Sequence, residues 1–222
     1  MTHPSIWIDL THKIEQGMPV YPGDPDVTFT SSRPERSGGF LVSQVSMGLH
    51  ASTHVDAPRH VRKAAVPIDQ IPIDRFVGEA SVIRIKPESG VLPTSAIRAQ
   101  YELLSHKHPR LLVDTSHACH WRSEVYFSHC PAFEADFPDW ARSQGIELLG
   151  GDFPTFWFQD HESLGLHRQL FDQGILLMEN LNSLERLIEE VYLIALPLSL
   201  CGLEASPVRA IAKNIISPRK SN

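Results

Sequence analysis

The sequence has few cysteines, no long apolar run and no excess of basic residues, and each shortage excludes a class of protein. Its three cysteines, at positions 119, 130 and 201, are too few and too irregularly spaced for a disulfide framework, so we expect a reducing, cytoplasmic location. No segment approaches the roughly 18 apolar residues of a membrane span. The net charge of -6 and the isoelectric point near 6.0 argue against nucleic acid or an anionic membrane as the main partner.

The chain also shows no internal repeat, no low-complexity tract and no N-terminal signal peptide. Residues 1–9 lack the basic and apolar regions that a signal peptide needs. A length of 222 residues with 42% hydrophobic content is enough for one domain with a well-developed core. We therefore predict a single domain over residues 1–216, followed by a C-terminal tail at 217–222.

Short apolar segments alternate along the chain with segments of helical composition. Strands are predicted at 6–10, 40–49, 80–85, 111–114, 146–150, 175–178 and 191–196. Helices are predicted at 94–104, 131–144 and 166–171, and a further helical pattern at 184–192 overlaps the last strand. This alternation predicts an α/β fold with a mixed sheet rather than a helical bundle.

Four side chains that bind metals lie within eleven residues: His50, His54, Asp56 and His60. All four occupy even positions, and alternate side chains of an extended backbone share a face, so the spacing predicts that they point to one place. Imidazole and carboxylate groups suit zinc and similar divalent ions. A single histidine on a strand is usually a surface or hydrogen-bonded core residue, but this dense pattern predicts a metal site.

The four residues need not share one role. His50, His54 and Asp56 would leave an open position for water, which is the layout of a catalytic zinc site rather than a structural one. Pro58 is expected to turn the chain before His60, so His60 is either a fourth ligand or a proton shuttle. We favour the shuttle, because an imidazole exchanges its proton near neutral pH.

The segment 50–60 resembles the His-x-Gly-Thr-His-x-Asp-x-Pro-x-His signature of the metal-dependent cyclase family, which includes bacterial kynurenine formamidases and isatin hydrolases. It differs at Ser52, where the family usually has glycine. Three other segments, 19–25, 150–155 and 205–210, resemble the family's Pro-Gly-Asp loop, Gly-x-Asp-x-Pro-Ser segment and Ser-Pro-x-Arg block. The resemblance implies the family's swivelling β/β/α fold and a homo-oligomer, either a dimer or a tetramer.

The resemblance also implies a second set of ligands. His167 and Glu179 match the spacing of a ligand pair in the formamidases. If the formamidase pattern applies to this chain, the first zinc ion would be held by His50, His54, Asp56 and Glu179. The second would be held by Asp56, His167 and Glu179. Taken alone, Glu179 would be interpreted as a solvated strand-end carboxylate and His167 as a helix surface residue. Either one or two zinc ions are expected, with manganese as the alternative.

Residues expected to contact a small-molecule substrate are Tyr21, Phe153 and Trp157. Tyr21 stands where the formamidases have a tryptophan that stacks on the substrate, and the segment 153–158 is rich in aromatic residues. That segment lines either a substrate pocket or a subunit contact. The histidines and cysteines of 117–130 are interpreted first as loop composition, second as a lid or pocket wall, and third as an extra metal site.

These observations predict a metal-dependent amidohydrolase in which His60 carries the proton. The preferred substrate is an aryl formamide, N-formylkynurenine, an intermediate of tryptophan catabolism, which would give an aryl amine and formate. A lactam or lactone hydrolase or cyclase with the same site is the alternative enzyme. A metal-holding binding protein without turnover is the alternative outside enzymes.

Overall fold

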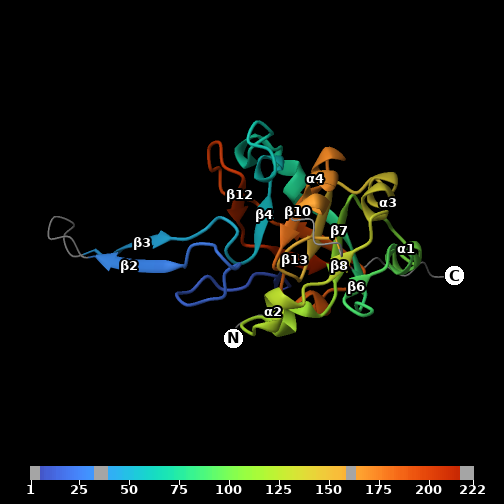
Figure 1. Ribbon diagram of the computed structural model, residues 1–222, viewed down its shortest axis with the longest axis horizontal. Coiled ribbons are helices and arrows are strands. Elements are labelled where there is room, and N and C mark those ends of the chain that lie inside the picture. Colours follow the sequence, from blue (N-terminus) through green and yellow to red (C-terminus); the bar gives the residue numbers. More distant parts are fainter. Residues whose placement is uncertain (1–5, 33–39, 159–163, 216–222) are drawn as a thin grey trace.

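A mixed sheet forms the centre of the molecule in the computed structural model, which describes residues 6–32, 40–158 and 164–215. Over these residues nine strands are ordered β1-β13-β11-β5-β7-β9-β10-β4-β12 (Figure 1). Their bounds are β1 Ile8–Asp9, β4 His54–Asp56, β5 Val77–Arg84, β7 Arg110–Asp114, β9 Leu148–Gly151, β10 Leu176–Glu179, β11 Glu190–Ile194, β12 Ala205–Pro207 and β13 Ile211–Asn214. The prediction of an α/β fold with a mixed sheet is confirmed.

The central strands β5, β7, β9 and β10 run parallel, and antiparallel strands flank them on both sides. Strands β7, β9 and β10 are buried along their whole length, which is why their residues, apart from Arg110, Asp114 and Glu179 at the strand ends, are apolar or glycine rather than alternating. Successive side chains still point to opposite faces: Leu111 and Val113 enter one apolar cluster and Leu112 enters the other.

Helices cover one face of this sheet. The α-helices are α1 (Thr94–Glu102), α2 (Val125–Ser128), α3 (Phe137–Ser143) and α4 (Gly165–Asp172). Side chains of α1, α3 and α4 pack with Leu111, Val113 and Leu177 in the larger cluster, so we call this side the helical face. The opposite face is covered mainly by short 3-10 helices at Ile68–Gln70, Ile73–Phe76 and Leu184–Arg186. No helix in the described ranges combines the length and the apolar character needed to cross a membrane.

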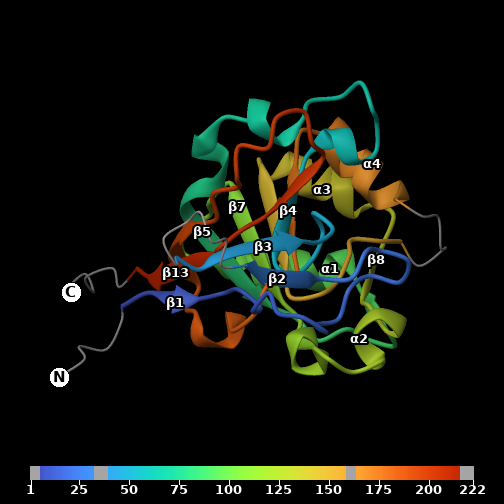
Figure 2. The same cartoon turned by 90° about the vertical axis from the view of Figure 1, so that its left-hand side faces the viewer.

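Two small sheets lie outside the main one. Strands β6 (Val91–Leu92) and β8 (Ala132–Phe133) pair in parallel, and β2 (Thr28–Ser32) and β3 (Val42–Ser46) form an antiparallel hairpin. The hairpin projects from the body in Figure 1 and points toward the viewer in Figure 2. It exposes an apolar cross-strand pair, Phe29 and Val45.

Several predicted elements are shorter in the structure. The strand predicted at 6–10 covers only Ile8–Asp9, and the one at 40–49 covers Val42–Ser46. The helix predicted at 131–144 begins only at Phe137, because residues before it serve α1: the Glu134 carboxylate accepts the Thr94 N–H, and Asp136 accepts the Thr94 hydroxyl. The helical pattern at 184–192 forms a single 3-10 turn before β11. The proposed tail at 217–222 lies outside the described residues.

The close approach of Phe153 to Gly151 supplies a test of the fold. A Cβ on Gly151 would lie 2.2 Å from Cζ of the fully buried Phe153 ring. Gly151→Ala is therefore expected to lower the free energy of unfolding by about 1–3 kcal/mol, the usual effect of overpacking. Gly48→Ala is the control, since its Cβ would meet nothing closer than 3.6 Å. Urea unfolding measures both, and equal stability of the two variants would contradict the packing described.

Candidate metal centre

The ladder between β4 and β10 places a histidine and two carboxylates side by side. His54 pairs directly with Glu179 across the ladder, and Asp56 pairs with Leu177. Val55 packs on the face opposite the helices, so alternation points His54 and Asp56 to the helical face. Leu177 packs on the helical face, and Glu179, two residues later, shares it. Strand pairing alone therefore brings these three polar side chains together in a buried place.

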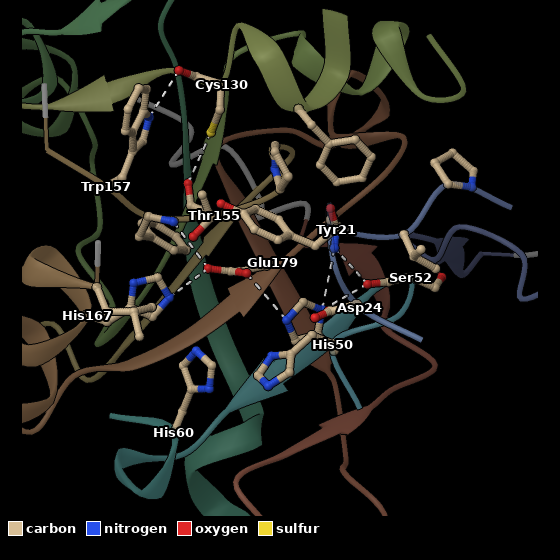
Figure 3. A pocket seen from close by; sticks show the side chains of 18 of the residues that line it. Tyr21, Asp24, His50, Ser52, His60, Cys130, Thr155, Trp157, His167 and Glu179 are labelled. Carbon is tan, nitrogen blue, oxygen red and sulfur yellow. Dashed lines mark hydrogen bonds and ion pairs between the residues drawn. The ribbon is translucent and has the colours of Figure 1, made fainter. Parts of the chain in front are cut away.

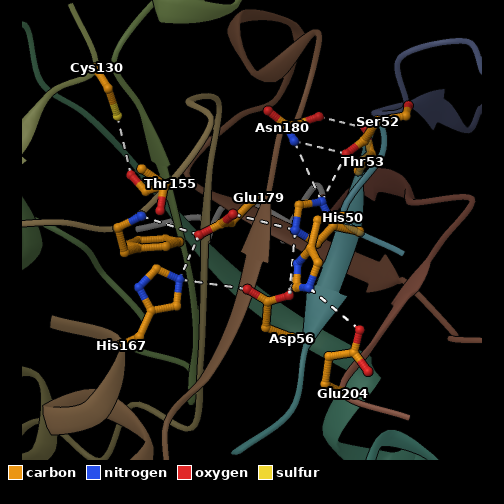
Figure 4. A network of polar contacts seen from close by, with 12 residues as sticks. His50, Ser52, Thr53, Asp56, Cys130, Thr155, His167, Glu179, Asn180 and Glu204 are labelled. Carbon is orange, nitrogen blue, oxygen red and sulfur yellow. Dashed lines mark hydrogen bonds and ion pairs between the residues drawn. The ribbon is translucent and has the colours of Figure 1, made fainter. Parts of the chain in front are cut away.

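Three further histidines approach the two carboxylates from elsewhere. His167, on α4, lies with Nε2 3.1 Å from Glu179 Oε1 and 3.6 Å from Asp56 Oδ2. His50 places Nδ1 2.9 Å from Asp56 Oδ1. The ring of His60, at the end of a 3-10 turn Pro58–His60, is centred 4.3 Å from that of His50. Figure 4 shows Asp56 and Glu179 between His50 and His167, and Figure 3 shows His60 near His50 and His167.

An extended backbone accounts for only part of this convergence, and the turn expected at Pro58 is present. Only His54–Asp56 is extended; residues 50–53 form a turn, and 58–60 form a 3-10 turn that begins at Pro58. Ser52 takes a φ of 62°, in the left-handed region that favours glycine. Its hydroxyl donates a 2.6 Å hydrogen bond to the His12 carbonyl, which holds the turn in place. The side chains converge as predicted, but a turn and the pairing of β4 with β10 bring them together.

The Ser52 carbonyl sets the orientation of His54. It accepts hydrogen bonds from His54 Nδ1 and from Asn180 Nδ2, each at 2.9 Å. With Nδ1 protonated, the Nε2 lone pair points to Asp56 and Glu179, 3.4 and 3.3 Å away. Asn180, also left-handed with a φ of 57°, is fixed by the Tyr126 hydroxyl, which donates to Oδ1 at 2.7 Å. Sequence patterns do not single out Asn180 or Tyr126, because this contact joins loops far apart in the chain.

The electrostatics of the centre call for positive charge. Burial opposes ionisation of Asp56, but His50, His54 and His167 outweigh it and hold its pKa well below the usual range. Burial and the charge of Asp56 both oppose ionisation of Glu179, yet the hydrogen bond from His167 Nε2 to its Oε1 lowers its pKa. For His50 and His167 burial alone would lower the pKa, and the carboxylates instead raise it to about 9. Two anions in a dry site are stable only beside cations.

The donor atoms fit a divalent metal. His54 Nε2 and both Asp56 oxygens are buried without a hydrogen bond of good geometry to any described residue, and Asp56 has only the nearby imidazoles as ion-pair partners. Two overlapping groups have ligand atoms within 4.8 Å of one another: His54, Asp56 and Glu179, and His50, Asp56 and His60. A lone pair and two carboxylate oxygens aimed at one another repel unless a cation lies between them. Nitrogen and oxygen ligands of this kind suit zinc and manganese.

A cavity of about 460 Å³ opens onto the centre (Figure 3). His54, Glu179 and His167 lie deepest, and aromatic side chains form much of the wall. Tyr21 and Trp157, two of the residues expected to contact substrate, both line this cavity. The Trp157 indole N–H donates to the carbonyls of Cys130 and Pro131.

Phe153 does not line this cavity, so its predicted contact with substrate is corrected. Its side chain is fully buried in the core, 4.9 Å from the Phe156 ring centre. Phe156 lines the cavity instead. The chain bends sharply after Gly151, so the ring of Phe153 folds back over that glycine rather than pointing outward.

The segment 117–130 forms part of the cavity wall. Trp121, Phe127 and Cys130 line it, and His117 is buried against Tyr126 with its Nε2 2.8 Å from the Tyr126 carbonyl. None of the metal-binding groups found among the described residues includes a residue of this segment. Of the three interpretations of this segment, the pocket wall is the one the geometry supports.

Comparison with known proteins agrees with this site. The putative cyclase family model matches residues 8–156. The chain is 31% identical to the kynurenine formamidase of Bacillus cereus over 213 residues, which cover 95% of this chain and 99% of that one. The kynurenine formamidase of Bacillus mycoides is equally similar, at 31% over the same span.

Solved structures share the fold. An isatin hydrolase bound to the product analogue thioisatinate superposes with a TM-score of 0.80 at 21% identity, covering 93% of this chain and 91% of the other. A potential metal-dependent hydrolase with cyclase activity superposes with a TM-score of 0.78, also at 21% identity, covering 95% and 98%. The fold and the buried histidine–carboxylate centre define a metal-dependent hydrolase. Within that class, the chain belongs to the putative cyclase family.

Removing one carboxylate tests the centre. Glu179→Gln keeps the side-chain shape but removes the charge, so we expect zinc affinity to fall by about 100-fold or more, since ligand carboxylates bind ionised. Glu204→Gln is the matched control, because Glu204 is exposed and only approaches His50 Nε2 at 4.0 Å. Zinc titration calorimetry of the metal-stripped protein measures both. Wild-type affinity in the Glu179 variant would contradict the assignment.

Proposed function

We propose that this protein hydrolyses the amide C–N bond of an aryl formamide, releasing an aryl amine and formate, and that N-formylkynurenine is the first substrate to test. The observation that carries the proposal is the group of buried histidine and carboxylate atoms, His54 Nε2 and the Asp56 oxygens among them, beside an aromatic cavity. The near full-length similarity to proteins named kynurenine formamidase supports the formamide as the substrate class.

We propose that the centre holds two ions, and that they are zinc. Each carboxylate extends one oxygen to each side: Asp56 Oδ1 faces His50 and His54 while Oδ2 faces His167. Glu179 divides in the same way, with Oε2 toward His54 and Oε1 toward His167. Two carboxylates placed between two sets of histidines suit bridging ligands. Metal analysis of the purified protein would distinguish zinc from manganese.

The metal, when bound, polarises a carbonyl oxygen and brings the pKa of water down to about 7. His60 is placed to carry the proton: it lies beside His50 and His167 and lines the cavity without a strand fixing it. Burial lowers the pKa of His60, so its imidazole is neutral and able to accept a proton at neutral pH. It would take the proton from the attacking water and deliver it to the leaving nitrogen, while the aromatic wall excludes bulk water.

The shuttle is tested by His60→Ala. We expect kcat on an aryl formamide to fall by about 10²–10⁴-fold, the usual contribution of a general acid–base group, while the metal content stays unchanged. His120→Ala is the control, because His120 is exposed and does not line the cavity. Rates are measured on metal-loaded protein, with isatins and lactones as competing substrates. A wild-type rate in the His60 variant would show that another group carries the proton.

We further propose a cytoplasmic location, because all three cysteines are free thiols and Cys119 and Cys201 are exposed. We also propose a homo-oligomer, a dimer or tetramer, in which the β2–β3 hairpin contacts a second copy. A two-stranded hairpin is marginally stable alone, and this one exposes Phe29 at 43% and Val45 at 51% on the same face. Contact with another copy would bury that pair.

Lysines on this face test the assembly. The double variant Phe29→Lys, Val45→Lys is expected to sediment as a smaller species than the wild type, because charge would have to be buried in the contact. Thr30→Lys with Gln44→Lys places the same charge on the neighbouring cross-strand pair, which faces the other way, and should leave the assembly intact. Sedimentation velocity measures both, and an unchanged size in the first variant would place the contact elsewhere.

A further inference from the structure

The charges on the cavity wall have an uneven distribution. Apart from the residues of the metal centre, the wall carries one charged side chain, Asp24, and none of the described residues that line it is a lysine or an arginine. Asp24 is half-buried, and no lysine or arginine of the described part of the chain forms an ion pair with it. Outside the metal centre, the described residues of the wall therefore offer a substrate one carboxylate without an ion-pair partner, and no lysine or arginine.

Asp24 lies toward the mouth of the cavity. It belongs to the turn 21–24, closed by the Asp24 N–H donating to the Tyr21 carbonyl at 2.9 Å. Tyr21 is 48% exposed, whereas Glu179 at the inner end is 4% exposed. Figure 3 shows Tyr21 and Asp24 on one side of the cavity, with Trp157 and Cys130 on the opposite side. A substrate with its amide at the metal centre and its ring side chain on this side of the cavity would approach Asp24.

Asp24 gives this turn a negative charge. Burial raises the pKa of the Tyr21 phenol, and the carboxylates of Glu179 and Asp24 raise it further. A cationic group is favoured in such a field, and a carboxylate is disfavoured, because it would lose water without gaining a positive partner.

We propose that Asp24 selects substrates that carry an ammonium group on the ring side chain, and that the cavity has no place for a substrate carboxylate. The inference rests on the proposed aryl formamide hydrolysis and specifies its substrate class. N-formylkynurenine carries both groups, so its ammonium group would be recognised and its carboxylate would stay at the solvent-facing mouth. Asp24 thus determines specificity without taking part in bond cleavage.

Four aryl formamides separate the two charges: N-formylkynurenine, its decarboxylated amine, its desamino acid, and uncharged formanilide. For metal-loaded protein we expect kcat/KM to be highest for the decarboxylated amine and at least tenfold lower for the desamino acid. Asp24→Asn should lower kcat/KM about tenfold for the amine and leave formanilide unchanged. Asp26→Asn, an exposed neighbour on the same loop, is the control and should change neither.

The corresponding aryl amine products are titrated in parallel by quenching of tryptophan fluorescence, since Trp121 and Trp157 line the cavity. Equal kcat/KM for the amine and the desamino acid, or an equal loss on all four substrates in Asp24→Asn, would overturn the role of Asp24. If none of the four substrates is hydrolysed, the proposed reaction is wrong. If the amine product nevertheless binds more tightly than the others, and this preference is lost in Asp24→Asn, the selectivity assigned to Asp24 still holds.

Discussion

The repulsion between two buried carboxylates is the constraint on which this structure depends. Asp56 and Glu179 lie on adjacent strands in a place with almost no solvent, where an unpaired negative charge is strongly unfavourable. Histidines from the segment 50–60 and from α4 surround them. The pKa values of His50 and His167 are raised, so that without a metal these two imidazoles hold protons that balance the negative charge. A bound metal would supply the positive charge in place of these protons. The same charge balance therefore links folding of the site to metal binding.

Backbone strain around the centre follows from this constraint. Ser52 and Asn180 both take left-handed φ values, which are unfavourable for residues other than glycine unless neighbouring contacts hold them. Each has such contacts: the Ser52 hydroxyl bonds to His12, and the Asn180 amide bridges Tyr126 and the Ser52 carbonyl. Together they fix the protonated nitrogen of His54 and leave the other free. Segments distant in sequence thus determine which imidazole nitrogen faces the carboxylates.

The fold class and the histidine cluster were predictable from the sequence because they depend on local patterns. Continuous apolar runs at 111–113 and 175–178 mark strands buried on both faces, and the spacing from His50 to His60 predicts a metal site. His167 and Glu179 needed resemblance to a family, since each alone looks like a surface residue. Phe153 was misplaced because composition cannot show that its ring folds back over a glycine. Tertiary contacts of this kind have no signature in one sequence.

X-ray absorption at the zinc edge of the loaded protein tests the centre most directly. The arrangement of Asp56, Glu179 and the histidines predicts only nitrogen and oxygen neighbours at about 2.0–2.2 Å, with the multiple scattering that imidazole ligands give. Cys130 lines the same cavity and would be the alternative sulfur ligand. A zinc–sulfur distance near 2.3 Å, or the absence of imidazole scattering, would contradict the proposed site.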